Sequence, residues 1–285
     1  PLSGRMFLTE PNLAEDGANR DEARGDAMVV DPQSTGSDSK SVASKLFAIL
    51  DSVQQHQDGS PSLTEIAQST GVPISTAHRL VAEWLAWGGL ERQPDGGYSI
   101  GQRLWEIGGT SPNIQNLRAA AMPFLEDLLY ASKQHSQLAI LDGADALYIE
   151  RLSSRTSTAI VSRPGRRLPL HATGVGLVLL AYSSPKFIAD FLAKDLHRFT
   201  PQTMVDAASL SNRLETIRRQ GLARTDEELH AGALSIAAPV RDRAGTVIAA
   251  MSIVVPVSDR DRPALETLVQ WGALGASRLL GYRKH

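Results

Sequence analysis

The chain has 285 residues, which is enough for two domains of ordinary size with separate hydrophobic cores. It contains no cysteine, so a disulfide framework and a thiolate nucleophile are excluded, and a metal could be held only by histidines and carboxylates. No apolar run approaches the length of a membrane span and no signal segment opens the sequence, so we expect a cytoplasmic protein that does not contact a membrane.

Charge is distributed unevenly along the chain. The formal charge is −4 over residues 1–40, −2 over residues 41–103 and +4 over the remainder. No part is strongly basic, so composition alone does not indicate nucleic-acid binding. Residues 1–39 are rich in Gly, Ser, Asn and acidic residues and lack apolar periodicity, which predicts a disordered tail.

Residues 40–101 have the pattern of an all-α winged helix-turn-helix domain with a β-wing. The run SVASKLFAILDSVQ has helical periodicity, with Val42 on the expected buried face. Ser62 is the expected N-cap of a second helix, and Glu65 completes a capping box. Pro73 suits the first position of a third helix, ISTAHRLVAEWLAW. The runs LERQ, PDGG and YSIG then predict a β-hairpin.

The third helix has two distinct faces. Its apolar residues recur at helical spacing and predict a buried stripe, made by Ala77, Leu80, Val81, Trp84 and Leu85. The opposite side carries short or polar side chains, namely Ser75, His78, Arg79 and Ala82, with Thr76 at its edge. A helix of this kind suits the major groove of DNA, where its first turns reach base edges.

Arg79 is the best candidate for a bidentate contact to guanine. Ser62, Thr64, Ser75 and Arg92 could hold phosphates, and Thr76 and His78 complete the expected DNA-binding set. His78 could read a base, contact a phosphate or serve a structural role. A second interpretation of the whole face is a solvated surface in a domain that uses its winged helix for protein contacts rather than DNA.

Residues 102–112 predict a short linker helix, and residues 113–285 predict an α+β domain. A long amphipathic helix passes through Leu117, Pro123 and Leu128. The strands QLAILDG, ALYIERL and STAIVSR follow, then helices near 174–193 and 205–220. Two apolar strands, LSIAAPVRD and TVIAAMSIVV, precede a last helix over 260–281. Antiparallel strands with helices on the faces are typical of sensor domains.

Four separated runs carry a family resemblance: LTEIAQSTGVPISTAHRLVAEWLAWGGLER, YSIGQRLWEIG, RPGRRLPLHATGVG and TDEELHAGALSIAAPVRDRAGTVIAAMSIVVP. From about Lys40 onward the chain resembles the IclR family of bacterial transcriptional regulators. The resemblance implies a winged helix joined by a linker helix to a GAF-like effector domain. It also implies double-stranded operator DNA as a partner, a small carboxylic or aromatic acid as effector, and a homodimer or homotetramer. Repressors and activators both occur, and a repressor is the expectation here.

The resemblance also implies where an effector would bind. Its lining would comprise Ser157, Ile160, Leu168, Ala172, Thr173, Gly174, Asp226, Glu227, Ser235 and Ser252. Three positions depart from the family pattern: Ser235 replaces a frequent Cys, Leu177 a usual Lys, and Val254 a hydroxyl residue. The loss at Val254 makes that side more apolar, which favours a larger or more apolar acid over a small α-keto acid.

The stretch LPLHATGVG could instead belong to an active site. His171 with an acidic residue could perform acid–base chemistry, but nucleophile-elbow, P-loop and dinucleotide signatures are absent from the sequence. His171, His230 and Glu228 lack recognisable metal-ligand spacing. We therefore expect no enzyme activity and no cofactor. The stretch is better interpreted as a loop feeding a helix, with Thr173 as cap, His171 as brace and free backbone N–H groups seating a carboxylate.

Overall fold

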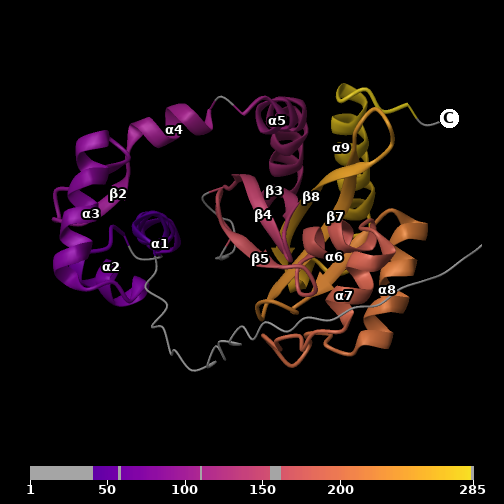
Figure 1. The fold of residues 1–285 in the computed structure, drawn as a ribbon. Helices are drawn as coiled ribbons and strands as arrows, with labels where there is room; N and C mark the ends of the chain where they lie inside the picture. Colours follow the sequence, from indigo (N-terminus) through magenta and orange to yellow (C-terminus); the bar gives the residue numbers. More distant parts are fainter. Residues whose placement is uncertain (1–40, 57–58, 110, 155–161, 284–285) are drawn as a thin grey trace, which may run out of the picture. The chain divides into compact units, whose positions relative to one another are not determined.

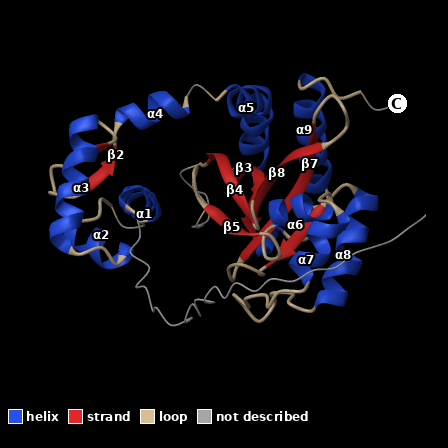
Figure 2. Cartoon of the chain, viewed as in Figure 1, coloured by secondary structure: helices blue, strands red, loops and turns tan. Residues whose placement is uncertain are grey.

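The computed structural model describes residues 41–56, 59–109, 111–154 and 162–283 (Figure 1). The tail expected over 1–39 lies outside these residues, as do Ser157 and Ile160 and most of the strand predicted from STAIVSR. Helices and a small hairpin make up the first described part, and a mixed α and β arrangement makes up the second (Figure 2).

The winged helix-turn-helix is confirmed by the first five elements of the described chain. They are α1 (Val42–Gln55), α2 (Leu63–Thr70), α3 (Ile74–Trp87), β1 (Leu90–Arg92) and β2 (Tyr98–Ile100). The two strands pair antiparallel as the wing. The core between the helices and the wing is formed by Ile49, Val53, Ile66, Leu80, Val81, Leu90 and Tyr98. Burial of these side chains fixes the relative positions of α1, α2 and α3.

Local signals at the helix ends were largely informative. Ser62 and Glu65 form the predicted capping box: the Ser62 amide donates to Glu65 Oε2 at 2.8 Å, and the Glu65 amide donates to Ser62 Oγ at 3.3 Å. The bonds that the Ser62 amide and the Ser62 hydroxyl donate to the Glu65 carboxylate lower the pKa of Glu65. Pro73 differs by one position, because it is the N-cap of α3 and the helix begins at Ile74. Val42 was wrongly expected on the buried face, since its first-turn position leaves it 54% exposed.

A short helix, α4 (Gln102–Gly108), follows the wing where the linker helix was predicted, and α5 (Pro112–Ser132) comes next. Pro123 lies inside α5, as the sequence predicted. The apolar side of α5 is buried through Leu117, Leu125 and Leu128, so this helix belongs to the core of the second domain.

The second domain is built on an antiparallel sheet with the strand order β5-β4-β3-β8-β7-β6. Its strands are β3 (His135–Asp142), β4 (Asp145–Leu152), β5 (Arg167–Pro169), β6 (Ala223–Asp226), β7 (Ala233–Arg241) and β8 (Val247–Pro256). One face is covered by α5 and α9 (Ala264–Leu279), and a short 3-10 turn over Val257–Asp259 precedes α9. The other face is covered by α6 (Gly174–Ala181), with α7 (Pro185–Leu192) and α8 (Ala207–Gln220) outside it (Figure 2).

The two edge strands β5 and β6 were not predicted. The stretch LPLHATGVG was expected to be a loop that leads into a helix, but its start is a strand that pairs with β4, with Leu168 opposite Ala146. Similarly, Asp226 was expected in a loop and instead ends β6, where it pairs with Leu234 of β7. Strands of three or four residues are too short to show a period of two, so their existence depends on the neighbouring strand.

The α6 helix is buried on every side, so its glycines are sites of close packing. A Cβ at Gly176 would lie 2.5 Å from both Cα and the carbonyl oxygen of Leu170. We expect Gly176→Ala to lower the free energy of unfolding by about 1–3 kcal/mol, because backbone must move to admit the methyl group. Urea denaturation measures this. Gly108→Ala is the control, because no atom lies within 4 Å of its Cβ position, and an equal loss there would contradict the packing argument.

Candidate functional site

The outer face of α3 is open to solvent. Ser75, His78 and Arg79 are exposed and Thr76 is partly buried, whereas Ala77, Leu80 and Val81 are buried as predicted. Trp84 and Leu85 are only partly buried, because they pack at the margin of the core. Within the described residues, Arg79 forms no ion pair. This surface presents one uncompensated cation among short polar side chains.

The candidate phosphate contacts lie around this face. Thr64 is exposed on α2, and Arg92 is exposed on the wing strand β1. The Ser62 hydroxyl is already used, since it accepts the Glu65 amide and donates to the Glu65 carboxylate. A phosphate could reach the exposed end of α2 only beside this cap. Contact of these side chains with DNA remains a prediction.

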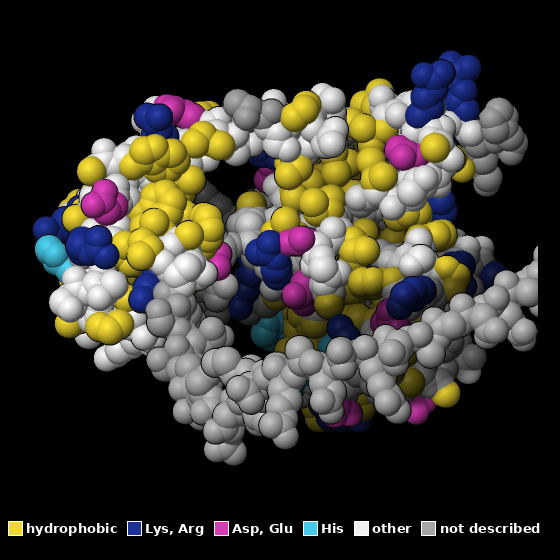
Figure 3. All heavy atoms as spheres, viewed as in Figure 1, with side chains coloured by type: hydrophobic (Ala, Val, Ile, Leu, Met, Phe, Trp, Pro, Cys, Tyr) yellow, Lys and Arg dark blue, Asp and Glu magenta, His cyan; other side chains and the backbone are white. Residues whose placement is uncertain are grey.

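The winged helix and the linker helix also expose large apolar side chains. Besides Ile74 at the start of α3, they are Val42 and Phe47 of α1, Trp87 at the end of α3, Ile100 of β2, and Trp105 and Ile107 of α4, and these six we call the linker apolar face. Trp105 is 74% exposed and Phe47 is 63% exposed. Figure 3 shows apolar side chains gathered over this part of the molecule. Contiguous apolar surface of this kind marks interaction sites.

A cavity opens in the second domain between the sheet and the start of α6. Its floor is formed by Gln137 of β3, Val254 of β8 and Ser235 of β7. The volume available to the centre of a water molecule is about 50 Å³, and the empty space is about 420 Å³ when the open mouth is included. Because one water needs about 10–15 Å³ by the first measure, the cavity holds roughly three to five waters, the space of a small organic acid.

One end of the cavity is formed by β4, β5 and the start of α6, with Tyr148, Leu168, Ala172 and Thr173 in its lining. Thr173 is the N-cap of α6, as predicted: its hydroxyl accepts the Gly176 amide at 3.1 Å and donates to the Pro169 carbonyl at 2.8 Å. Burial raises the pKa of Tyr148 above its ordinary value, and a hydrogen bond with Thr173 partly opposes this rise. The phenol is therefore a neutral group at physiological pH.

The start of α6 also carries unused amide groups. Among the described residues, no protein acceptor is found for the backbone N–H groups of Gly174 and Val175. These amides lie in the first turn of a helix, where the helix dipole favours an anion. The glycines themselves have a different role from the one expected. A Cβ at Gly174 would meet Ser235 Oγ at 2.6 Å, so this glycine admits β7 rather than a ligand.

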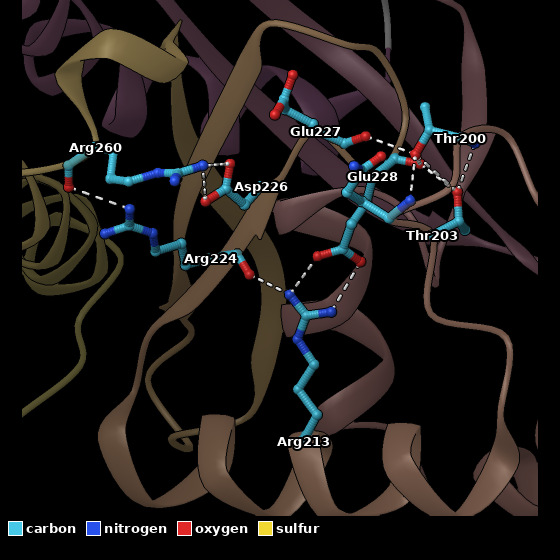
Figure 4. A network of polar contacts seen from close by, with 9 residues as sticks. Thr200, Thr203, Arg213, Arg224, Asp226, Glu227, Glu228 and Arg260 are labelled. Atoms are coloured by element: carbon cyan, nitrogen blue, oxygen red, sulfur yellow. Dashed lines mark hydrogen bonds and ion pairs between the residues drawn. The ribbon is translucent and has the colours of Figure 1, made fainter.

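The other end of the cavity is formed by β6 and the connection to β7. Thr225, Glu228, Leu229, His230 and Ala233 line it. The connection is tied down by side chains from the loop before α8, because Thr200 Oγ1 donates to the Glu227 carbonyl at 2.7 Å and Thr203 Oγ1 to the Glu228 carbonyl at 2.6 Å (Figure 4). These bonds hold the wall of the cavity in place.

Glu228 of this wall forms a buried ion pair with Arg213, which does not itself line the cavity. Arg213 of α8 donates Nη1 to Glu228 Oε2 at 2.8 Å and Nη2 to Glu228 Oε1 at 2.7 Å (Figure 4). The Glu228 side chain is 7% exposed and that of Arg213 is 19% exposed. Arg213 Nη2 also donates to the Arg224 carbonyl, so both of its N–H groups have protein acceptors. Such a two-point geometry fixes the carboxylate in one orientation.

The predicted effector residues divide into two groups. Leu168, Ala172, Thr173 and Ser235 line the cavity, and Gly174 lies directly beneath Ser235. The expectation for the other three requires correction. The Asp226 carboxylate is paired with Arg260, that of Glu227 accepts the Gly232 amide, and Ser252 is fully buried and bonded to Gln137. Strand register turns Asp226 away from the cavity, because Thr225 points inward.

Sequence reasoning missed several cavity residues. Tyr148, Gln137 and Thr225 come from strands that are distant in the chain, and no local motif connects them. Glu228 was considered as a metal ligand and as one of the acidic run Asp226, Glu227 and Glu228, but was not assigned to the effector site, although it is the buried member of that run. Of the three neighbouring acids only Glu228 is buried, and its burial depends on Arg213, which lies fifteen residues earlier in the chain.

His171 does not line the cavity. Its Nε2 lies 2.9 Å from the His197 carbonyl, and its ring packs 5.8 Å from that of Phe199. The predicted bracing role is consistent with this contact, but the brace reaches a distant loop rather than its own. Among the described residues, no group of three or more His and acidic side chains could hold a metal ion. No helix in the described part of the chain is long and apolar enough to cross a membrane.

Comparison with known families decides the identity of this arrangement. The family described as "IclR helix-turn-helix domain" matches residues 42–94, and "Bacterial transcriptional regulator IclR C-terminal" matches residues 112–271. The chain belongs to the IclR family. As a member of this family it is a DNA-binding transcriptional regulator with a ligand-binding C-terminal domain, and not an enzyme.

Individual IclR-family relatives resemble most of the chain. It is 33% identical over 225 residues to the HTH-type transcriptional regulator XynR of Escherichia coli K12, covering 77% of this chain and 89% of XynR. It is 31% identical over 221 residues to the transcriptional repressor IclR of the same strain, covering 76% and 80%. An IclR homolog from Microbacterium hydrocarbonoxydans, solved in complex with 4-hydroxybenzoate, has a TM-score of 0.78 and 32% identity, covering 84% of this chain and 99% of that chain.

Proposed function

We propose that this protein is a repressor whose affinity for operator DNA is controlled by a monocarboxylic acid bound in the cavity at the start of α6. We assign residues 40–101 to DNA binding, residues 102–112 to the linker and residues 113–285 to effector binding and oligomerisation. The observation that carries the proposal is the cavity itself, whose lining includes the Thr173 cap of α6 and the neutral hydroxyl group of Tyr148. Regulators of chromosomal DNA in bacteria work in the cytoplasm, which is where we expect this one.

The acid group of the effector would sit at the first turn of α6. The amides of Gly174 and Val175 can donate to a carboxylate, and Tyr148 offers a neutral hydroxyl group. No lysine or arginine is among the described residues that line the cavity. A single negative charge suits such a seat, since backbone dipoles must balance it without help from a cation.

The rest of the effector would be apolar, and we favour an aromatic ring. Leu168, Ala172, Leu229 and Val254 give the cavity apolar surface on several sides. The size of the cavity suits one ring. The homolog solved with 4-hydroxybenzoate supports the same class of ligand. The absence of a hydroxyl group at Val254 favours a ring over a small α-keto acid.

We propose that the linker apolar face joins two copies of this chain. Phe47, Trp105 and Ile107 expose large apolar side chains that a second copy can bury. A dimer with twofold symmetry would present two α3 helices to half-sites roughly 34–36 Å apart on one face of DNA. An effector can alter DNA affinity only if it binds the DNA-competent and incompetent arrangements differently, with a coupling of about 1–3 kcal/mol.

The DNA-binding assignment is tested at Arg79. We expect Arg79→Ala to lose about 1–3 kcal/mol of discrimination between the selected operator and a scrambled duplex, because a bidentate guanine contact disappears. Fluorescence anisotropy with an operator obtained by in vitro selection measures both affinities. Arg219→Ala is the control, since Arg219 is exposed on α8. Unchanged discrimination in Arg79→Ala would remove this residue from the reading surface.

Salt dependence separates the proposal from its alternative. If the winged helix binds DNA, the logarithm of the binding constant falls linearly with the logarithm of salt concentration, with a slope set by the phosphates neutralised. If the winged helix serves only protein contacts, no such binding is seen at low salt. Adding benzoate to the protein–operator complex then tests effector control, and identical operator affinity at saturating acid would contradict it.

A further inference from the structure

The cavity carries charge at one end only. Among its described lining residues, the groups that can carry a full charge near neutral pH are Glu228 and His230. His230 is exposed at the mouth, whereas Glu228 is buried. Because Arg213 does not line the cavity, the charged group that a ligand meets at this wall belongs to Glu228 and not to its partner.

The sheet order places Glu228 and Tyr148, the hydroxyl group of the proposed acid seat, at opposite ends of the cavity. Tyr148 belongs to β4 and Thr225 to β6, and the strands β3, β8 and β7 lie between them. Glu228 follows Thr225 by three residues on the same side of the cavity. Val254 contributes apolar floor between the ends. A ring whose carboxylate binds at the Tyr148 hydroxyl group therefore points its far side towards Glu228.

The ion pair leaves acceptor sites on the Glu228 carboxylate free for further hydrogen bonds. Each of its carboxylate oxygens accepts one bond from Arg213, and an ionised carboxyl group offers about four acceptor sites. It has no proton to donate in this form. A ligand hydroxyl group opposite the acid would find an acceptor, and a second ligand carboxylate would meet a like charge.

We infer that Glu228 is a specificity-determining residue, which selects aromatic monoacids bearing a hydroxyl group opposite the carboxylate and rejects diacids. This inference rests on the proposed function, because it takes the acid to bind at the start of α6. Arg213 is a positioning residue, which holds the carboxylate in place and balances its charge when no ligand is bound. Together, Glu228 and Arg213 determine which group is accepted at the end of the ligand opposite its carboxylate.

The test compares three probes, 4-hydroxybenzoate, benzoate and terephthalate, by isothermal titration calorimetry on the full chain. For the natural protein we expect 4-hydroxybenzoate to bind about tenfold more tightly than benzoate, and terephthalate to bind most weakly. In Glu228→Gln the ratio of the affinities for 4-hydroxybenzoate and benzoate should fall towards one. Terephthalate should bind this variant about tenfold more tightly than it binds the natural protein, because its second carboxylate no longer meets the charge of Glu228 while Arg213 stays positive.

Two further variants keep the test decisive. Glu228→Gln leaves a cation without its partner and could unfold the domain, so the double variant Arg213→Gln/Glu228→Gln removes both charges together. This double variant should lose the preference for 4-hydroxybenzoate over benzoate. Its affinity for terephthalate should rise by less than that of the single variant. Asp226→Asn is the matched control, since its carboxylate pairs with Arg260 away from the cavity, and it should keep the natural ratios.

The ratios distinguish recognition from a structural role. A purely structural pair would weaken all three probes by the same factor and leave the ratios unchanged, which would overturn the inference while the proposed effector class stands. Binding of none of the three acids to the natural protein would overturn both the effector class and the role of Glu228. A changed ratio in Glu228→Gln, with natural ratios in Asp226→Asn, supports the inference.

Discussion

Ser235→Trp is expected to abolish the response to effector while operator binding without effector persists. Ser235 lies on the floor of the cavity against Gly174, so an indole ring there fills the space that a ligand would occupy. The winged helix has its own core and does not depend on this side chain. At an acid concentration about 100 times the dissociation constant, the natural protein should gain about 2.7 kcal/mol of stability, and the variant should gain none.

Thermal-shift titration with benzoate, followed by operator binding with and without acid, measures this result. Ala231→Trp is the matched control, because Ala231 lies four residues before Ser235, in the connection between β6 and β7. It is exposed and does not line the cavity. It should respond to acid as the natural protein does. A normal response in Ser235→Trp would show that the effector binds elsewhere.

Trp105→Glu is expected to separate the dimer and to lower operator affinity by about 100-fold or more. Two linked winged helices bind the second half-site at an effective concentration set by their connection, and a monomer loses this advantage. The charge would be placed on the most exposed member of the linker apolar face, where a partner must bury it. The fold of each copy should survive, because Trp105 is 74% exposed.

Analytical ultracentrifugation reports the mass, and fluorescence anisotropy reports the affinity for the operator. Tyr130→Glu on α5 is the control, because Tyr130 is 77% exposed but lies outside the linker apolar face. It should leave mass and affinity unchanged. A dimer that survives in Trp105→Glu with natural operator affinity would exclude this face as the interface.

The winged helix could be predicted closely because its signals are local. The capping box at Ser62, the apolar stripe of α3 and the linker helix at Gln102 each depend on residues within a few turns of one another. The apolar strands β7 and β8 are long enough to show their character without a partner. Hydrogen bonds and side-chain spacing inside one element are encoded by neighbours in the chain.

The effector cavity was predicted only where it coincides with a local motif. Thr173 and its neighbours belong to a helix start, so their place could be expected from a few residues. The acidic run could not be resolved in the same way. Asp226, Glu227 and Glu228 are equivalent by composition, and only Arg213 and the register of β6 decide that Glu228 faces the cavity.

The sequence by itself therefore determined the helices, the long strands, the winged helix and the cap of α6, because each is stabilised by contacts between residues close in the chain. The tertiary structure alone decided the edge strands, the members of the cavity and the glycine contacts of α6. These depend on which distant strands pair and in what register, and a shift of one residue would turn every inward side chain outward.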